Sequence, residues 1–114
     1  STLRTLMQIA ESKHTAWTVF ALTGKLDQEG SAQLKAALAP HLGSSQLALD
    51  FTYVEYVTSV GFRVLLQTLK EQTAKGGRLL IGNMSQPVYS FFEIAGLNTT
   101  FKVVHDIYPT VATP

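Results

Sequence analysis

Hydrophobic positions along this chain follow two alternating patterns, continuous apolar runs and stripes with helical spacing. The runs are rich in β-branched and aromatic residues, which favour strands. They predict strands over residues 3–11, 17–23, 46–51, 78–81 and 101–105. The first two flank a turn at residues 12–15 and should form an antiparallel hairpin. The second is apolar at nearly every position, which is typical of a strand buried on both faces.

Residues 24–27 interrupt the second run, and the first helical stripe follows them. Leu34, Leu38 and Leu42 fall at positions i, i+4 and i+8, so they share one face of a helix. Pro40 limits this helix, because a proline in a helix interior costs about 3 kcal/mol. The regular helix should therefore end next to this proline.

A second stripe predicts a strongly amphipathic helix after a loop at residues 52–57. Apolar residues on one of its faces repeat at i, i+3, i+4 and i+7, and polar residues occupy the opposite face. The apolar positions are Phe62, Leu65, Leu66 and Leu69, and the polar positions are Arg63, Gln67, Lys70 and Glu71. Gly76 and Gly77 follow as the helix exit.

A third stripe predicts the last helix, around residues 88–95. Pro87 in its first turn and Gly96 just past its end mark the two boundaries. The complete order is β-β-α-β-α-β-α-β. It predicts one α/β domain with a small, mixed but mostly parallel sheet flanked by helices, because strands joined through helices pair in parallel. We expect this domain to span residues 1–107 and residues 108–114 to form a frayed tail.

Composition narrows the class of protein. The chain has 114 residues, of which 46% are hydrophobic and 15% charged, as expected for one globular domain. It has no cysteine, which excludes disulfides, thiolate-bound metals and a thiol nucleophile. Nine Lys and Arg against eight Asp and Glu give a net charge of +1 without a charge run, so no nucleic-acid partner is expected.

The apolar runs also bear on location. Each is only a handful of residues long, far below the roughly 18 that a membrane span needs, so no direct membrane insertion is expected. The start of the chain lacks a charged segment followed by an apolar signal core. The sequence therefore predicts a cytoplasmic protein.

Few residues indicate catalysis. The glycine-rich phosphate loops of nucleotide enzymes are absent. His14, His41 and His105 lack the spacing of a metal site, so neither a metal nor a cofactor is expected. Asp27 precedes a helix, where capping is its ordinary role. Asp50 ends a predicted strand at the edge where open α/β sheets collect functional groups, but alone it names no reaction.

The start of the second helix is the most informative segment. Ser59 lies at or next to the N-cap, where a hydroxyl ordinarily satisfies a free backbone N–H. The same position suits a phosphoacceptor, because a phosphoryl group there faces free N–H groups and the positive end of the helix dipole. Gly61 has no side chain, which would let another protein approach closely, although packing alone could also explain it.

Four motifs occur in a fixed order along the chain. They are a strand that ends in G-x-L-D, the long motif V-L-D-L-x-x-V-x-Y-[IM]-[DS]-S-x-G-L, the motif G-G-x-L, and a helix that ends in G-L before a phenylalanine. They match residues 21–27, 47–62, 76–79 and 96–101. With these motifs in this order, the chain resembles the STAS domain of anti-sigma factor antagonists over residues 3–107.

The resemblance implies a regulatory protein without catalysis of its own. Such a protein works by partner switching: unphosphorylated, it binds an anti-sigma factor with serine kinase activity and frees a sigma factor. Phosphorylation releases the anti-sigma factor, and a serine phosphatase restores the first state. Ser59 falls on the family's phosphoacceptor position. The partner-binding surface is expected at Asp27, Thr58, Ser59, Val60, Gly61, Phe62 and Arg63, although the spacing of Phe62 also fits burial in the core.

Two residues depart from the family's pattern. Thr58 stands where the best-known antagonists have an aspartate, and Val60 stands where the residue is often small. Thr58 is therefore an alternative acceptor, and the missing carboxylate could alter kinase recognition.

Two other functions stay open. STAS-like domains also resemble accessory subunits of lipid-transport ABC complexes and components of stress-signalling assemblies, so a constitutive scaffold is the main alternative. A nucleotide-hydrolysing enzyme is a third, for which the chain offers no phosphate loop and no evident base–nucleophile pair. The sequence identifies neither the sigma factor, kinase and phosphatase nor the oligomeric state.

Overall fold

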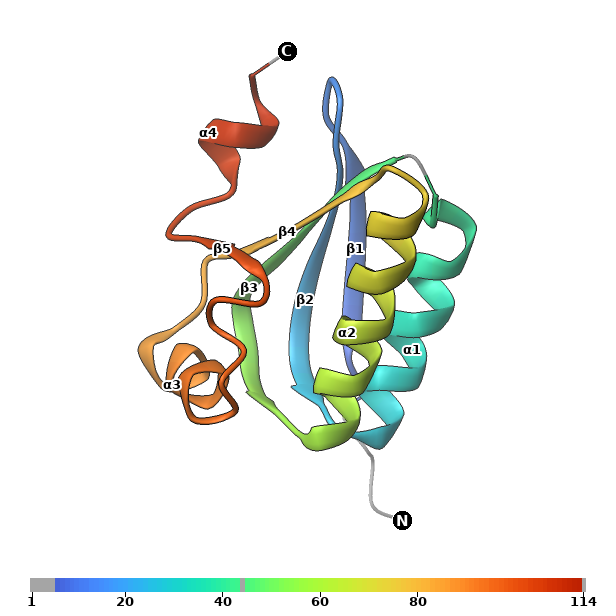
Figure 1. Ribbon diagram of the computed structural model, residues 1–114. Coiled ribbons are helices and arrows are strands. Elements are labelled where there is room, and N and C mark those ends of the chain that lie inside the picture. Colours follow the sequence, from blue (N-terminus) through green and yellow to red (C-terminus); the bar gives the residue numbers. More distant parts are fainter. Residues whose placement is uncertain (1–5, 44, 114) are drawn as a thin grey trace.

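A five-stranded mixed sheet runs through the molecule in the order β1-β2-β3-β4-β5 (Figure 1). The computed structural model describes residues 6–43 and 45–113. The strands are β1 (Gln8–Lys13), β2 (Thr18–Leu26), β3 (Gln46–Val57), β4 (Arg78–Gly82) and β5 (Lys102–Val104). β1 and β2 form the predicted antiparallel hairpin, and the three remaining pairs are parallel. The part of the first predicted strand before residue 6 lies outside the described residues.

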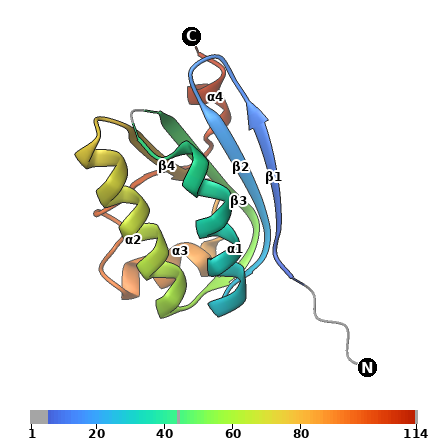
Figure 2. The same ribbon diagram turned by 90° about the vertical axis from the view of Figure 1, so that its right-hand side faces the viewer.

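Helices cover both faces of the sheet. They are α1 (Gln28–Leu38), the short 3-10 helix η1 (Ala39–His41), α2 (Ser59–Ala74), α3 (Gln86–Ile94) and α4 (Tyr108–Val111). α1 and α2 pack side by side on one face, and α4 lies on the other (Figures 1 and 2). The predicted order β-β-α-β-α-β-α-β is confirmed, with α4 added at its end. Gly76 and Gly96 have φ angles of 78° and 72°, which confirms the two predicted helix exits.

The main core lies between the sheet and the helices α1, α2 and α3. Alternate residues of β3 point to opposite faces, so Leu47, Leu49 and Phe51 enter this core while Ala48 faces the other side. The ring of Phe92 packs edge-on against three other phenylalanines. Ring centroids lie 6.1 Å away at Phe51, 4.9 Å at Phe62 and 5.8 Å at Phe101. These contacts attach α3 to the rest of the domain.

β2 and β3 are both longer than predicted. Residues 52–57, predicted as a loop, continue β3, and residues 24–26, predicted as a break, continue β2. The two extensions pair with each other, ending at Leu26 opposite Val57. Register shifts interrupt this part of the ladder, so the inward-facing residues lose the strict period of two on which a strand prediction depends.

The buried face of α2 is also rotated from the predicted one. Leu66, predicted to face the core, is 37% exposed, whereas Val64, Thr68 and Gln72 are buried. Gln72 can be buried because its side-chain amide is fully paired. It donates to the Ser45 and Arg78 carbonyls at 2.9 and 3.0 Å and accepts from the Gly43 N–H at 2.8 Å. Buried polar residues on this face make the apolar stripe in the sequence misleading.

The prediction of a frayed tail at residues 108–114 is wrong for its described part, residues 108–113, which includes the helix α4. α4 is docked on the second face of the sheet, where Ile107 and Val111 have no exposed surface. They pack into a small cluster with Trp17, Val19, Ala48 and Leu80. The turn before α4 is held by Asn83, which accepts a hydrogen bond from the Ile107 N–H at 2.9 Å and donates one to Asp106 at 3.0 Å. Two apolar residues four apart were too short a pattern to predict a helix.

Asp50 lies within β3 and not at its end as predicted. It is 8% exposed, and its carboxylate accepts hydrogen bonds from the Thr52 N–H at 2.9 Å and the Thr52 hydroxyl at 2.6 Å. The hydroxyl of Tyr108 on α4 also donates to this carboxylate. Asp50 therefore anchors α4 to the sheet.

This anchor predicts a pH dependence of stability. Burial, together with the hydrogen bond to the Asp50 carboxylate, raises the pKa of Tyr108 from 10.0 to about 12. The folded state then holds this proton more tightly than the unfolded state, so the stabilisation is complete below pH 10 and is lost as the pH rises towards 12. In urea titrations at successive pH values, the free energy of unfolding should fall more steeply between pH 10 and 12 for the wild type than for Tyr108→Phe. Parallel pH profiles of the two proteins would contradict the assignment.

Candidate functional site

The start of α2 is tied directly to the end of β2. Thr58 is the N-cap of α2, with the extended backbone angles φ −91° and ψ 175°. Its hydroxyl donates to the Leu26 carbonyl at 2.9 Å and is 3.5 Å from the Gly61 nitrogen. Its backbone N–H donates to the same carbonyl at 3.1 Å. Thr58 therefore fills the capping role that the sequence left open for Ser59.

Ser59 is the first residue of α2 and is exposed. This position confirms the expectation that it lies at or next to the N-cap. Within residues 6–43 and 45–113, its hydroxyl has no hydrogen-bond partner. The site thus presents an accessible hydroxyl at the positive end of a 16-residue helix.

Gly61 is buried beneath this helix start. A Cβ atom at this position would lie 2.6 Å from the Leu26 carbonyl oxygen and 2.8 Å from a methyl group of Val57. No side chain fits there without a shift of backbone. Of the two explanations left open by the sequence, the structure supports packing of α2 against β2.

Asp27 lies at the same edge of the sheet. Because Leu26 pairs with Val57, Asp27 and Thr58 each follow a paired residue. Asp27 is the N-cap of α1, and its carboxylate accepts a hydrogen bond from the Gly30 N–H at 2.9 Å. The predicted capping role is confirmed, and the two capped helix starts lie next to each other.

The remaining residues of the predicted surface differ in exposure. Arg63 is exposed and Val60 is half-buried. Phe62 is also half-buried, and its ring packs against Phe92 in the core. Phe62 therefore contributes to the core, which was one of the two interpretations that its spacing allowed.

A shallow groove extends from Ser59 along α2, with a volume of about 480 Å³. We call it the α2 groove. Its wall on α2 includes Phe62, Arg63, Leu66 and Lys70, and Leu97 after α3 lies opposite. The sequence could not indicate it, since Leu66 fits the core pattern and the turn after α3 reaches α2 only in the folded chain.

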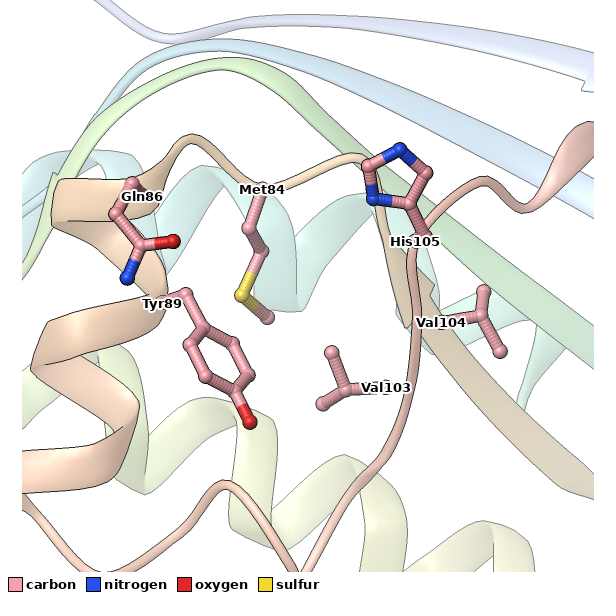
Figure 3. Close-up of a pocket in the computed structure, with 6 residues that line it drawn as sticks. All are labelled: Met84, Gln86, Tyr89, Val103, Val104 and His105. Atoms are coloured by element: carbon pink, nitrogen blue, oxygen red, sulfur yellow. The ribbon is translucent and has the colours of Figure 1, made fainter.

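A second cavity, of about 310 Å³, lies between α3 and β5. Met84, Gln86, Tyr89, Val103 and His105 line it (Figure 3). It includes none of the residues of the predicted partner-binding surface. Among the described residues, no three His, Asp or Glu side chains are grouped so as to hold a metal ion. The cavity between α3 and β5 is thus separate from the start of α2.

Comparison with known proteins identifies the family. Residues 9–105 match the family described as "Mlab, STAS domain". The chain belongs to the STAS domain family. The resemblance that the sequence motifs indicated is confirmed, and so is the predicted fold class.

Relatives of this STAS domain include anti-sigma factor antagonists. BtrV of Bordetella bronchiseptica, which carries the description of an anti-sigma factor antagonist, is 28% identical over 101 residues, or 87% of each chain. The crystal structure of an anti-sigma factor antagonist from Mycobacterium paratuberculosis superposes with a TM-score of 0.80 at 21% identity, covering 92% of this chain and 93% of the other.

SpoIIAA, another anti-sigma factor antagonist, shares the fold in two states. Its unphosphorylated form superposes with a TM-score of 0.73 at 20% identity, covering 90% of this chain and 93% of SpoIIAA. The phosphorylated Bacillus form superposes with a TM-score of 0.67 at 19% identity, covering 90% of this chain and 96% of SpoIIAA.

Among the described residues of this STAS domain, no helix is long and apolar enough to cross a membrane.

Because Thr58 caps α2 and Ser59 does not, alanine substitutions at the two positions should change the free energy of unfolding by different amounts. Thr58→Ala removes the N-cap and the hydrogen bond to the Leu26 carbonyl, so it should lower the free energy of unfolding by about 1 kcal/mol. Ser59→Ala, one residue further on, should change it by less than about 0.5 kcal/mol, since the side chain is exposed. Urea denaturation followed by circular dichroism measures both. Equal losses in the two variants would mean that Ser59 shares the capping role.

Proposed function

We propose that this STAS domain is an anti-sigma factor antagonist that acts by partner switching through Ser59. The unphosphorylated form binds an anti-sigma factor with serine kinase activity and thereby frees a sigma factor. Phosphorylation of Ser59 releases the anti-sigma factor, and a serine phosphatase reverses the modification. The observation that carries the proposal is the exposed Ser59 hydroxyl at the first position of α2.

The geometry favours Ser59 over Thr58 as the acceptor. The Thr58 hydroxyl donates to the Leu26 carbonyl at 2.9 Å, so phosphorylation there would break the cap of α2. The Ser59 hydroxyl has no such partner among the described residues. Thr58 also accounts for one departure from the antagonist pattern, because threonine and aspartate are both good N-caps. The substitution keeps the cap and removes a carboxylate next to the acceptor.

Phosphorylation at Ser59 is compatible with a folded domain. The phosphoryl group adds about −1.5 to −2 charges at the positive end of α2, where negative charge is favourable. Phosphorylation would instead destabilise the complex, since a partner that packs around Ser59 would have to bury this charge. A loss of about 3–4 kcal/mol weakens binding several hundredfold, enough to transfer an anti-sigma factor between partners.

The main alternative is a constitutive scaffold in a transport or signalling complex. In that case a partner would bind the same surface whatever the state of Ser59. Neither function assigns a catalytic residue to this chain. The two are separated by how binding responds to charge at Ser59.

A capture experiment from lysate of the source cells tests the proposal. Wild type, Ser59→Ala and Ser59→Glu serve as baits, and captured proteins are identified by mass spectrometry. We expect wild type and Ser59→Ala to capture an anti-sigma factor with a kinase domain and Ser59→Glu to lose it. Incubation of the wild type with this partner and ATP should yield a phosphopeptide modified at Ser59.

Gln86→Glu is the matched control. Gln86 is exposed and is the first residue of α3, as Ser59 is of α2, so the variant adds the same charge at the same helical position elsewhere. It should capture the same proteins as the wild type. If all four baits retain the same transporter or scaffold components, the switch is wrong and the scaffold function stands.

A further inference from the structure

The α2 groove follows one face of α2 from its first residue, Ser59, to Lys70. The lining residues Ser59, Phe62, Arg63, Leu66 and Lys70 form a continuous stripe, because each lies three or four residues from another of the five. From the first to the last, the stripe is about 16 Å long at 1.5 Å per residue. That length matches three turns of another helix.

The apolar part of the groove has no cover within the described residues. Leu66 is 37% exposed, and Phe62 and Leu97 are half-buried. Ile94, the last residue of α3, is 85% exposed, and the next residue, Ala95, lines the groove. Among the described large hydrophobic residues, only Leu6, Tyr53, Leu66, Ile94 and Tyr108 are exposed, and Leu66 is the one that lines the groove. The contiguous apolar surface of Phe62, Leu66 and Leu97, bordered by polar residues of α2, is a pattern found at binding surfaces.

The charged residues of the groove are both cations. Arg63 and Lys70 are exposed, and neither forms an ion pair or hydrogen bond with the described residues. The acidic residues Glu71 on α2 and Glu93 on α3 do not line the groove. The whole chain carries a net charge of only +1, so this positive character is local.

We propose that the α2 groove binds an acidic amphipathic helix of a partner protein. Its apolar side chains would cover Phe62, Leu66 and Leu97, and its carboxylates would pair with Arg63 and Lys70. Two cations are few for a contact with an anionic membrane, whereas exposed apolar residues at helical spacing are what a partner helix packs against.

The groove also explains how Ser59 could control binding, and this step rests on the proposed function. Arg63 follows Ser59 by four residues, so a phosphoryl group on Ser59 would pair with Arg63 on the same face of α2. The modification would then neutralise one of the two cations and place negative charge at the end of the groove. Both effects oppose an acidic occupant.

Two synthetic peptides of roughly 14 residues test the site. Both carry leucines at i, i+3, i+4 and i+7; one has glutamates on its polar face and the other has lysines. We expect the acidic peptide to shift the backbone amide resonances of residues 59–70 and 94–97 in ¹⁵N-labelled protein. The lysine peptide should leave them unchanged.

Charge-reversal variants identify the contacts. The double variant Arg63→Glu/Lys70→Glu should bind the acidic peptide at least about tenfold more weakly in fluorescence anisotropy. Lys13→Glu/Lys102→Glu is the control, because it makes the same change in net charge at exposed positions outside the groove. It should bind like the wild type apart from a small general effect that salt screens.

Several outcomes would overturn the proposal: equal binding of the two peptides, resonance shifts confined to other surfaces, or equal weakening by both double variants. Binding of phosphatidylglycerol vesicles that depends on Arg63 and Lys70, without binding of the acidic peptide, would identify a membrane contact instead. The peptide test does not involve phosphorylation. If the acidic peptide does not bind the groove but Ser59→Glu still fails to capture the anti-sigma factor, only the groove proposal is refuted. If the peptide binds but Ser59→Glu captures the same proteins as the wild type, only the switch is refuted.

Discussion

The arrangement of the site depends on one junction, where the Leu26 carbonyl at the end of β2 accepts two hydrogen bonds from Thr58. This junction sets where α2 begins and how closely it approaches the sheet. Gly61 permits the contact, because the space that its Cβ would need is filled by Leu26 and Val57. Ser59 is placed at the surface because the residue before it is committed to the cap.

The same junction brings separate parts of the chain to one edge of the sheet. Extension of β2 and β3 carries both strands past the end of β4 and places the N-caps Asp27 and Thr58 side by side. Under the proposed function, the Ser59 hydroxyl lies on a capped and packed helix start, so a change of charge there would act on the bound partner and leave the fold intact. The opposite face of the sheet is closed separately by α4, whose Tyr108 reaches Asp50.

The face of α2 that turns away from the core is a consequence of polar burial. Gln72 and Thr68 occupy core positions because their side chains are hydrogen-bonded, Gln72 to three backbone groups and Thr68 to the Val64 carbonyl at 2.8 Å. The helix is rotated accordingly, and Leu66 is left at the surface beside Arg63 and Lys70. The orientation of α2 therefore accounts both for the exposed Leu66 and for the buried Gln72 and Thr68.

The sequence by itself determined the order of elements, the hairpin, the helix boundaries at Pro87 and Gly96, and the motif that places Ser59 at the start of α2. These are local properties, set by periodicity, capping and turn chemistry within a few residues. Only the tertiary structure decided the length of β3, the docking of α4, the roles of Thr58 and Gly61, and the exposure of Leu66. Each of these depends on a contact between residues far apart in the chain, such as Leu26 with Thr58 or Gln72 with Ser45, whose energy no local pattern contains.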